Sequence, residues 1–374
     1  MTSAPPTPRP PLSQSEGRDQ LDAHLRATVA WHLAPDTGTP YWIDYAAEHH
    51  IKPDDIRTFD DLISAFGHFD ERALRFEPHE RMTPRAYAGQ PFHVFETGGT
   101  TGMPKQRLNW HDFQHDYTQF AATLRDEHFP PGGTWLMVGP TGPRRLRLAI
   151  EHLAHVRGSS CYFIDLDPRY VKRVIAEGKA TEARHYMNHV VEQAMMLLRH
   201  RPISALFTTP KLLEALAEKV SLVRSGIRGA FVGGTTMTPQ YTRFLIEEVC
   251  EQRDGDCMGT KGVGFYPTYG NTLMGVAPHK PTIKEDGYAI TYYPPQPRAV
   301  IRIVDPDNTQ NTVPYGEFGR VELTTLTKEF FMPRFLERDE ARRAEPWLEK
   351  YPWDGVAEVR PFGANTTKIV EGVY

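Results

Sequence analysis

The sequence predicts an α/β fold, in which helices flank a largely parallel sheet, followed by a small β-rich subdomain. Between about residues 130 and 270, short apolar runs alternate with helical apolar stripes, a pattern typical of parallel sheets. After residue 276, strand-like segments follow one another without such stripes. The chain has 374 residues, 40% of them hydrophobic and 24% charged, so a large core can form. We expect a disordered Pro-rich tail (1–20), an α/β core (21–275) and a β-rich subdomain with a C-terminal tail (276–374).

Each predicted strand is a short apolar run bounded by turn residues. Helices are expected between the runs because apolar residues recur three and four positions apart, and because Asp167-Pro168 and Thr238-Pro239 are typical helix starts. Segments rich in β-branched and aromatic residues predict a mostly antiparallel subdomain at the end. The predicted strands are 91–97, 134–140, 160–167, 204–210, 229–234 and 262–270 in the core, and 288–294, 299–305 and 320–326 in the subdomain.

Composition excludes several classes of function. The net charge is −4 and the 43 Lys and Arg residues are spread along the chain, which disfavours a nucleic-acid partner. The sequence contains no run of about 18 apolar residues, so it predicts no transmembrane helix. Three cysteines without metal-ligand spacing suggest free thiols in a reducing cytoplasm, where we expect the protein. His111 and His115 could share a helix face, but no third ligand lies nearby, so no metal site is predicted.

The most informative stretch is FETGGTTGMPKQRLNW, residues 95–110. We expect it to be a loop between a strand and a helix, where bare backbone N–H groups and the helix N-terminus favour an anion. Threonine hydroxyls add donors, and Lys105 adds a mobile positive charge suited to phosphate. The spacing does not match a P-loop. By itself the stretch is equally compatible with a solvent-exposed turn.

Residues 100–105, TTGMPK, resemble the phosphate loop of the acyl-adenylate-forming superfamily, which includes acyl-CoA synthetases, peptide-synthetase adenylation domains and luciferases. Further segments resemble elements of that superfamily in the same order: FVGGTTMTP (231–239) its adenine-contacting segment, YPTYGNT (266–272) its Tyr-Gly-x-Thr-Glu element, GEFGRVELTTL (316–326) its Gly-Glu-x-Gly turn, and MPRFLERD (332–339) its Arg-Tyr-Arg-Thr-x-Asp element. DLDPRYV (165–171) and the pair Arg338-Asp339 are similar to the phenylacetate-CoA ligase-like branch. The resemblance covers about residues 90–340.

The resemblance implies an ATP site. Tyr269 would offer a flat face to adenine, and Asp339 would accept hydrogen bonds from the ribose hydroxyls. Taken singly, Tyr269 is as readily a core aromatic and Asp339 a solvated charge. The implied catalytic residues are Lys105, Thr100 and Thr101, and the implied ATP-binding residues are Thr97, Gly98, Gly99, Gly102, Gly233, Gly234, Thr235, Tyr269, Gly270, Asn271, Thr272 and Asp339.

The acid-binding pocket is less well defined. Phe265 and Tyr266 are equally compatible with a pocket wall and with core packing. Arg145 could meet a second carboxylate on the substrate, although the run 144–147 also fits a solvated helix face. Two positions depart from the superfamily pattern: Gly98 replaces a serine, and Leu273 replaces the glutamate that helps to hold Mg²⁺ in relatives. We expect ATP and Mg²⁺ as cofactors, with the metal held mainly by ATP oxygens and water.

The chain ends at Tyr374 without a match to the superfamily's C-terminal lid domain, so we expect the large N-terminal domain alone. In length and plan the chain resembles stand-alone adenylating proteins of phenazine antibiotic biosynthesis. That resemblance implies activation of an aromatic carboxylic acid as an acyl-adenylate, which a partner reductase or transferase then consumes. Two alternatives remain: a catalytically weak or inactive nucleotide- or ligand-binding protein, and an aryl-CoA ligase that needs a separate C-terminal domain.

Overall fold

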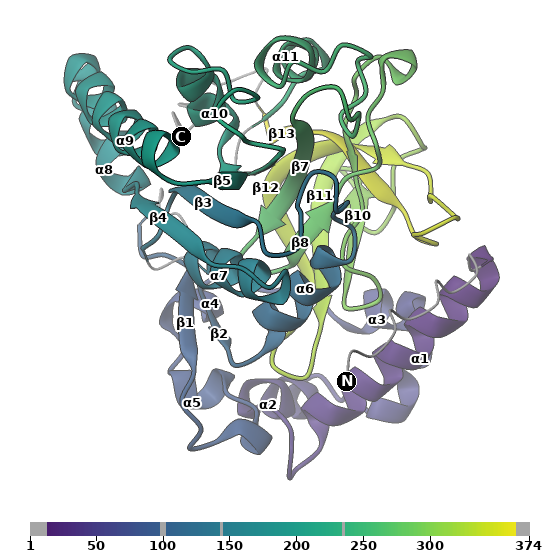
Figure 1. The fold of residues 1–374 in the computed structure, drawn as a ribbon. Coiled ribbons are helices and arrows are strands. Elements are labelled where there is room, and N and C mark those ends of the chain that lie inside the picture. The colour runs from purple at the N-terminus through teal and green to yellow at the C-terminus, as the bar shows by residue number, and fades with distance from the viewer. Residues whose placement is uncertain (1–12, 98–101, 143–144, 234–235, 364–374) are drawn as a thin grey trace, which may run out of the picture.

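The computed structural model describes residues 13–97, 102–142, 145–233 and 236–363. It contains a six-stranded sheet, a five-stranded sheet and a two-stranded ladder. Helices lie on both faces of the six-stranded sheet, and the N-terminal helices lie beside the five-stranded sheet (Figure 1). The α/β fold with a β-rich subdomain, as the sequence predicts, is confirmed.

The six-stranded sheet has the order β4-β3-β5-β6-β7-β8. Its first five strands are parallel, and β8 is antiparallel to β7. The strands are β3 (Thr134–Gly139), β4 (Cys161–Asp165), β5 (Ile203–Thr208), β6 (Gly229–Gly233), β7 (Gly264–Asn271) and β8 (Gly275–Pro278). Because β8 belongs to this sheet, the sheet extends three residues past residue 275, where the sequence predicts that the α/β core ends.

Alternating side chains of these strands form two cores, because successive residues of a strand point to opposite faces. Trp135, Met137 and Phe207 pack on one face with residues of α6 and α7. Leu136 and Leu206 pack on the other face with residues of α9 and α10. The helices after the loop are α6 (Asp112–Ala121), α7 (Leu146–Val156), α8 (Pro168–Ala176), α9 (Ala180–His200), α10 (Pro210–Ala217), α11 (Pro239–Phe244), the π-helical turn η3 (Leu245–Val249) and the 3₁₀ turn η4 (Lys284–Asp286).

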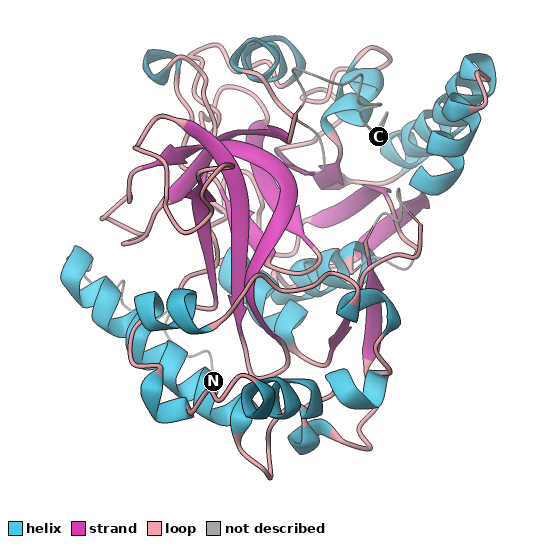
Figure 2. Ribbon diagram, turned by 180° about the vertical axis from the view of Figure 1, so that it is seen from behind, coloured by secondary structure: helices cyan, strands magenta, loops and turns pink. Residues whose placement is uncertain are grey.

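The five-stranded sheet is antiparallel throughout, with the order β10-β11-β12-β13-β9. Figure 2 shows its long strands side by side, with the N-terminal helices below them. The strands are β9 (Thr291–Tyr292), β10 (Ala299–Val304), β11 (Phe318–Leu326), β12 (Phe331–Ala344) and β13 (Gly355–Pro361). The sequence did not predict β12 and β13, because β12 contains a proline and its second half is charged rather than alternating.

The glycine-rich loop does not lead into a helix, contrary to the prediction. It joins β1 (His93–Glu96) to β2 (Gln106–Asn109), which pair as an antiparallel ladder. Helix α6 begins only at Asp112, and its N-terminal amides are bound by Glu329: the carboxylate accepts hydrogen bonds from the backbone N–H groups of Trp110, His111 and Asp112 at 2.6–3.1 Å. The helix N-terminus is therefore already occupied by an internal anion and cannot serve the loop.

Helix α1 begins at Gln14, so residues 14–20 are helical rather than part of the predicted tail. Ser13 and Glu16 form a capping box that fixes this start. Residues 1–12 lie outside the described residues. The other N-terminal elements are α1 (Gln14–Leu33), α2 (Pro40–Glu48), η1 (Pro53–Asp55), α3 (Phe59–Ala65), α4 (Ala73–Phe76), α5 (His79–Met82) and η2 (Arg85–Tyr87).

Candidate nucleotide and acid site

The two large sheets meet through paired side chains at the carboxyl end of β7. The Tyr269 hydroxyl donates a hydrogen bond to Asp339 Oδ2 at 2.7 Å, and Asn271 Nδ2 donates to Glu337 Oε1 at 2.5 Å. Tyr269 and Asn271 are two residues apart on β7, as Glu337 and Asp339 are on β12, so each pair projects to one side of its strand. The sequence-predicted residues Tyr269, Asn271 and Asp339 are thus brought together.

Asp339 is largely withdrawn from solvent and lies beside another carboxylate. Burial raises the pKa of its carboxyl to about 6, and the neighbouring charge of Glu337 acts in the same direction. The Tyr269 hydroxyl and the positive charge of Lys105 oppose that rise. Burial and Asp339 also raise the pKa of Tyr269, which therefore remains a hydrogen-bond donor. A donor ligand such as a sugar hydroxyl, or a nearby cation, would favour the ionised form of Asp339.

Lys105 lies between the glycine-rich loop and β12. Its side chain is buried, its Nζ lies 4.6 Å from the centre of the Phe335 ring, and its charge acts on Asp339. Lys105 Nζ also lies 3.6 Å from Glu71 Oε2. The charge of the lysine that the loop motif singles out therefore acts on an aspartate that lies more than 200 residues later in the sequence.

Glu71 is a member of this site that the sequence did not predict. Besides Lys105, it pairs with Arg75 at 3.3 Å and Arg338 at 3.4 Å. Burial disfavours ionisation of Glu71, but the charges of Lys105, Arg75 and Arg338 outweigh burial and lower its pKa. Arg75 also donates to the carbonyl of Met103 in the loop. Nothing in the local sequence 70–76 marks a functional residue, because the partners come from other segments.

Thr97 and Lys105 close the base of the loop. The N–H of Thr97 donates to the Lys105 carbonyl at 3.0 Å, and the N–H of Lys105 donates to Thr97 Oγ1 at 3.1 Å. Gly102 has φ +107°, a value that side-chain-bearing residues rarely adopt. Gly98, Gly99, Thr100 and Thr101 lie outside the described residues, as do Gly234 and Thr235, so their predicted roles stay predictions.

The remaining predicted glycines and Thr272 surround the same place. Gly233 ends β6, where an added Cβ would lie 3.1 Å from Thr268 Oγ1. Gly270 is exposed, and a Cβ built there would have no atom within 4 Å. The carbonyl of Thr272 accepts a hydrogen bond from Arg107 at 3.4 Å. Open space beside Gly270 leaves room for a ligand against the backbone.

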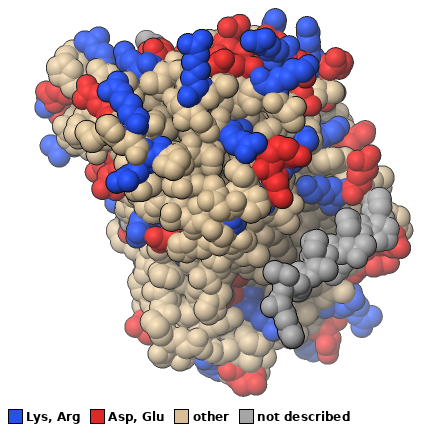
Figure 3. Space-filling view, viewed as in Figure 1, with Lys and Arg blue, Asp and Glu red and all other residues tan. Residues whose placement is uncertain are grey.

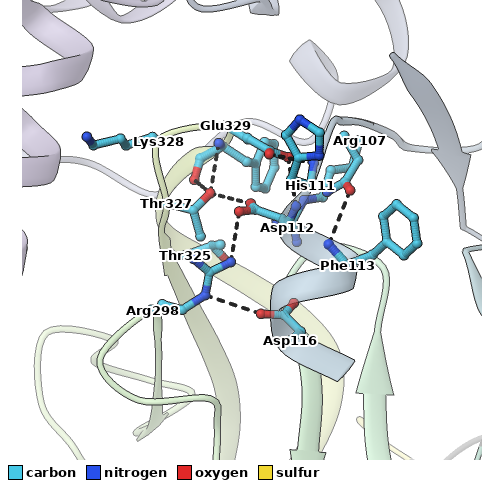
Figure 4. A network of polar contacts seen from close by, with 12 residues as sticks. Arg107, His111, Asp112, Phe113, Asp116, Arg298, Thr325, Thr327, Lys328 and Glu329 are labelled. Atoms are coloured by element: carbon cyan, nitrogen blue, oxygen red, sulfur yellow. Dashed lines mark hydrogen bonds and ion pairs between the residues drawn. The ribbon is translucent and has the colours of Figure 1, made fainter. Parts of the chain in front are cut away.

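Arg107 is a second residue that the sequence did not single out. It lies two residues after Lys105 on β2, is fully buried, and donates to the Leu273 carbonyl at 2.8 Å and to Asp112 Oδ2 at 2.7 Å. Figure 4 shows Arg107 beside Asp112, which Arg298 also contacts. Arg107 therefore fixes β2, which begins directly after Lys105, against the turn that follows β7.

A cavity of about 290 Å³ opens at the carboxyl ends of β3 and β4, where parallel sheets commonly bind ligands. Its wall includes Thr141, Asp165, Asp167, Arg169 and Tyr186. Arg169 also pairs with Glu96 at 2.8 Å, at the end of β1 next to the loop. The cavity is therefore connected to the base of the loop through Arg169.

None of the three predicted pocket residues lines this cavity. Phe265 is buried in the hydrophobic core, and Tyr266 is buried against Phe129 and bonded to His128 at 2.9 Å, so core packing accounts for both. Arg145 is neither on a solvated helix face nor in the cavity. It is buried and donates to the Gly275 carbonyl.

The described residues do not provide a cage for a divalent metal. Leu273, at the position of the superfamily's metal-binding glutamate, is fully buried in the core. Glu96 is engaged by Arg169 and Gln106. Among the residues that the structure describes, no group of three or more His, Cys, Asp or Glu side chains could hold a metal ion. The described residues therefore do not fit a protein-held Mg²⁺.

On the face drawn in Figure 3, Lys and Arg side chains are interspersed with Asp and Glu, so the described residues form no large patch of one charge there. Within the described part of the chain, none of the helices combines the length and the apolar character that crossing a bilayer requires.

No protein-family model matches the sequence, and no curated protein matches it either. Solved structures, in contrast, match almost the whole chain. The 2-hydroxyisobutyryl-CoA ligase in complex with 2-HIB-AMP, in its postadenylation state, superimposes with a TM-score of 0.67 at 14% identity, covering 99% of this chain and 74% of the ligase. The same ligase with 2-HIB-AMP and CoA in its thioesterification state superimposes with a TM-score of 0.66 at 16% identity, covering 95% of this chain and 69% of the ligase. Its open conformation gives 0.66 at 15% identity, with 99% and 82% covered. Over most of its length the chain is thus structurally similar to ligases that form acyl-adenylates.

Proposed function

We propose that the chain binds ATP and activates a carboxylic acid as an acyl-adenylate. One observation carries the proposal: Lys105, Tyr269 and Asp339, far apart in the sequence, converge within one site. The ammonium group of Lys105 suits the phosphates, the Tyr269 ring suits adenine, and Asp339 suits the ribose hydroxyls. The structural match to a ligase solved with an acyl-adenylate supports the same reaction class.

In this proposal the acid binds in the 290 Å³ cavity beside Arg169 and Tyr186. A carboxylate oxygen attacks the α-phosphorus of ATP, the bond to the bridging oxygen breaks, and pyrophosphate leaves. The protein contributes position and charge: Lys105 leaves Glu71 for the phosphate oxygens, and Arg169 faces the acid. The Tyr186 ring is compatible with an aromatic acid, whereas Asp165 and Asp167 disfavour a second carboxylate on it. We propose that a reductase or transferase consumes the adenylate, as in phenazine-type pathways.

A second candidate is a nucleotide-binding protein without catalysis. The observation that favours it is Leu273. This buried leucine stands where the superfamily has a metal-binding glutamate, so the carboxylate is missing. Binding of ATP is common to both candidates, so only turnover separates them.

The test is ATP–pyrophosphate exchange with a panel of aliphatic and aromatic acids, run beside calorimetric ATP binding. Adenylation predicts exchange with at least one acid, reduced about 100-fold or more in Lys105→Ala, a loss typical for a group that stabilises developing charge. Lys280→Ala, an exposed lysine outside the site, is the matched control and keeps full exchange. ATP binding without exchange across the panel supports the second candidate, and the absence of ATP binding rejects both.

A further inference from the structure

A second cavity, of about 350 Å³, lies between α1, the turn η2, the start of α6 and the β11–β12 turn. We call it the α1–α6 cavity. Its wall includes His24, Tyr87, His111, His115 and Arg298. Its size is in the range of small-molecule sites. Among the described residues its wall includes none of Lys105, Tyr269 and Asp339, so it is separate from the candidate nucleotide site.

The carboxylate of Asp112 in this wall is already satisfied by the protein. Its Oδ1 accepts from Arg298 Nη2 at 2.8 Å, and its Oδ2 accepts from Arg107 at 2.7 Å and from the Thr327 hydroxyl at 2.5 Å (Figure 4). Burial opposes ionisation of Asp112, but Arg107 and Arg298 outweigh burial and lower its pKa. Asp112 is therefore a paired anion rather than an open acceptor.

The carboxylate of Glu329 is also engaged. Both of its oxygens accept hydrogen bonds from the backbone N–H groups that begin α6. This position at a helix N-terminus spreads its charge over three amides. Lys328, the preceding residue, extends over the Trp31 ring, with its Nζ 4.5 Å from the ring centre. The acceptor oxygens of Asp112 and Glu329 are thus hydrogen-bonded within the protein, although burial and the charge of Asp112 raise the pKa of Glu329.

The hydrogen-bond donors of the cavity, in contrast, are not used up. Within the described part of the chain, the Tyr87 hydroxyl, the ring nitrogens of the exposed His111 and His115, and Arg298 Nη1 make no hydrogen bond to another protein group, and all four residues line the cavity. Arg298 donates to Asp112 through Nη2 at 2.8 Å and to Asp116 through Nε at 3.2 Å. Its Nη1 takes part in neither hydrogen bond. Burial lowers the pKa of both His24 and His115, and the charge of Arg298, which lines the same cavity, acts in the same direction.

We propose that the α1–α6 cavity binds a small oxyanion, either an organic carboxylate or a phosphate. A guanidinium N–H, a phenol and imidazoles converge on one space in which the acceptors are already taken, so an acceptor-rich ligand complements it. The ligand would bind Arg298 Nη1 while the two aspartates keep the rest of the guanidinium in place. This site would share its anchor, Arg298–Asp112–Arg107, with the strand of Lys105.

The test is calorimetric titration of the full chain with inorganic phosphate and, separately, with citrate, at constant ionic strength set by NaCl. Binding with a dissociation constant on the order of 1 mM or tighter is expected for at least one anion. Binding of phosphate alone identifies a phosphate site, and binding of citrate alone identifies a carboxylate site. Each should weaken by about five-fold in Tyr87→Phe and in His115→Ala, the loss of roughly one hydrogen bond. Neither change removes a partner of a buried charge, so both variants should fold.

Two controls separate this site from others. His155→Ala removes an exposed histidine outside the cavity and should leave anion binding unchanged. Lys105→Ala removes the lysine of the candidate phosphate loop. Anion binding in the α1–α6 cavity should persist in this variant, whereas phosphate held by the loop would be lost. The proposal is overturned if neither anion binds, if the two cavity variants bind as well as the parent chain, or if Lys105→Ala abolishes binding.

Discussion

The Tyr269 hydroxyl donates a 2.7 Å hydrogen bond to Asp339 Oδ2 and so links the parallel sheet to the antiparallel one. The bond lies at the carboxyl end of β7, where Gly270 is exposed. It opposes the rise in the pKa of Asp339 that burial and Glu337 cause. A ligand that donates a hydrogen bond to Asp339 would therefore lower the pKa of its carboxyl further.

The first prediction concerns stability. Because the pKa of Asp339 is about 6 in the folded chain, above the ordinary value of 3.8, folding favours its protonated form. The contribution of Asp339 to the free energy of unfolding is therefore most favourable below about pH 4 and is lost as pH rises through about 6. Asp339→Asn should therefore raise the free energy of unfolding by roughly 2 kcal/mol at pH 7.5 and much less at pH 4. Urea unfolding at the two pH values checks this, and equal effects at both would contradict it.

The second prediction concerns the pH dependence of ligand binding. Ribose hydroxyls need an ionised Asp339 as acceptor, so adenosine should bind more tightly as pH rises through about 6. Tyr269→Phe removes a hydrogen bond to the carboxylate and should move that midpoint to higher pH. Adenosine is the suitable probe because it has no phosphate that titrates in this range. A midpoint that stays in place in Tyr269→Phe would show that the hydroxyl does not tune Asp339.

The third prediction concerns Glu71, which competes with phosphate for Lys105. Glu71→Gln removes the negative charge 3.6 Å from Lys105 Nζ, so ATP should bind about two- to five-fold more tightly while adenosine binds as before. Stability should fall by roughly 1–3 kcal/mol, because the side chains of Arg75 and Lys105 are only 9% and 8% exposed and lose the charge of their carboxylate partner. Weaker ATP binding in this variant would instead mean that Glu71 positions the lysine.

The fourth prediction uses the open space beside Gly270. Gly270→Ala should change the free energy of unfolding by no more than about 0.5 kcal/mol, because its Cβ would meet no atom within 4 Å. Nucleotide affinity should fall about ten-fold if the base or ribose approaches this backbone. Gly67→Ala, whose Cβ would make only an ordinary contact at 3.8 Å, is the control and should alter neither quantity. Unchanged affinity in Gly270→Ala would place the nucleotide elsewhere.

The fifth prediction concerns Arg107. Arg107→Met leaves the buried Asp112 with one guanidinium instead of two and removes a donor from the Leu273 carbonyl, so the chain should lose roughly 3–5 kcal/mol of stability. Adding Asp112→Asn should cost less than the sum of the two single changes, because the two residues are coupled. Thermal unfolding of the four proteins measures this, and strict additivity would show that the two side chains act independently.

Short-range patterns in the sequence determined the α/β class, the strands β3 to β7 and the helices between them. They did so because the period of apolar residues differs between a strand and a helix. The order of the motifs also singled out Lys105, Tyr269 and Asp339 as candidate site residues; the structure joins Tyr269 to Asp339 by a hydrogen bond, and the roles of all three stay predictions. The roles assigned to Thr100, Thr101 and Thr235 still await a test.

Only the tertiary structure decided which groups surround those residues. Glu71 and Arg107 reach the site from segments without a recognisable motif, and Glu329 binds the start of α6 from more than 200 residues away. Likewise, Arg145 looked solvated because its neighbours in sequence are basic, yet the fold buries it on the Gly275 carbonyl. The physical reason is that burial and ion pairing depend on segments that meet only after folding, whereas periodicity and turn chemistry are properties of adjacent residues.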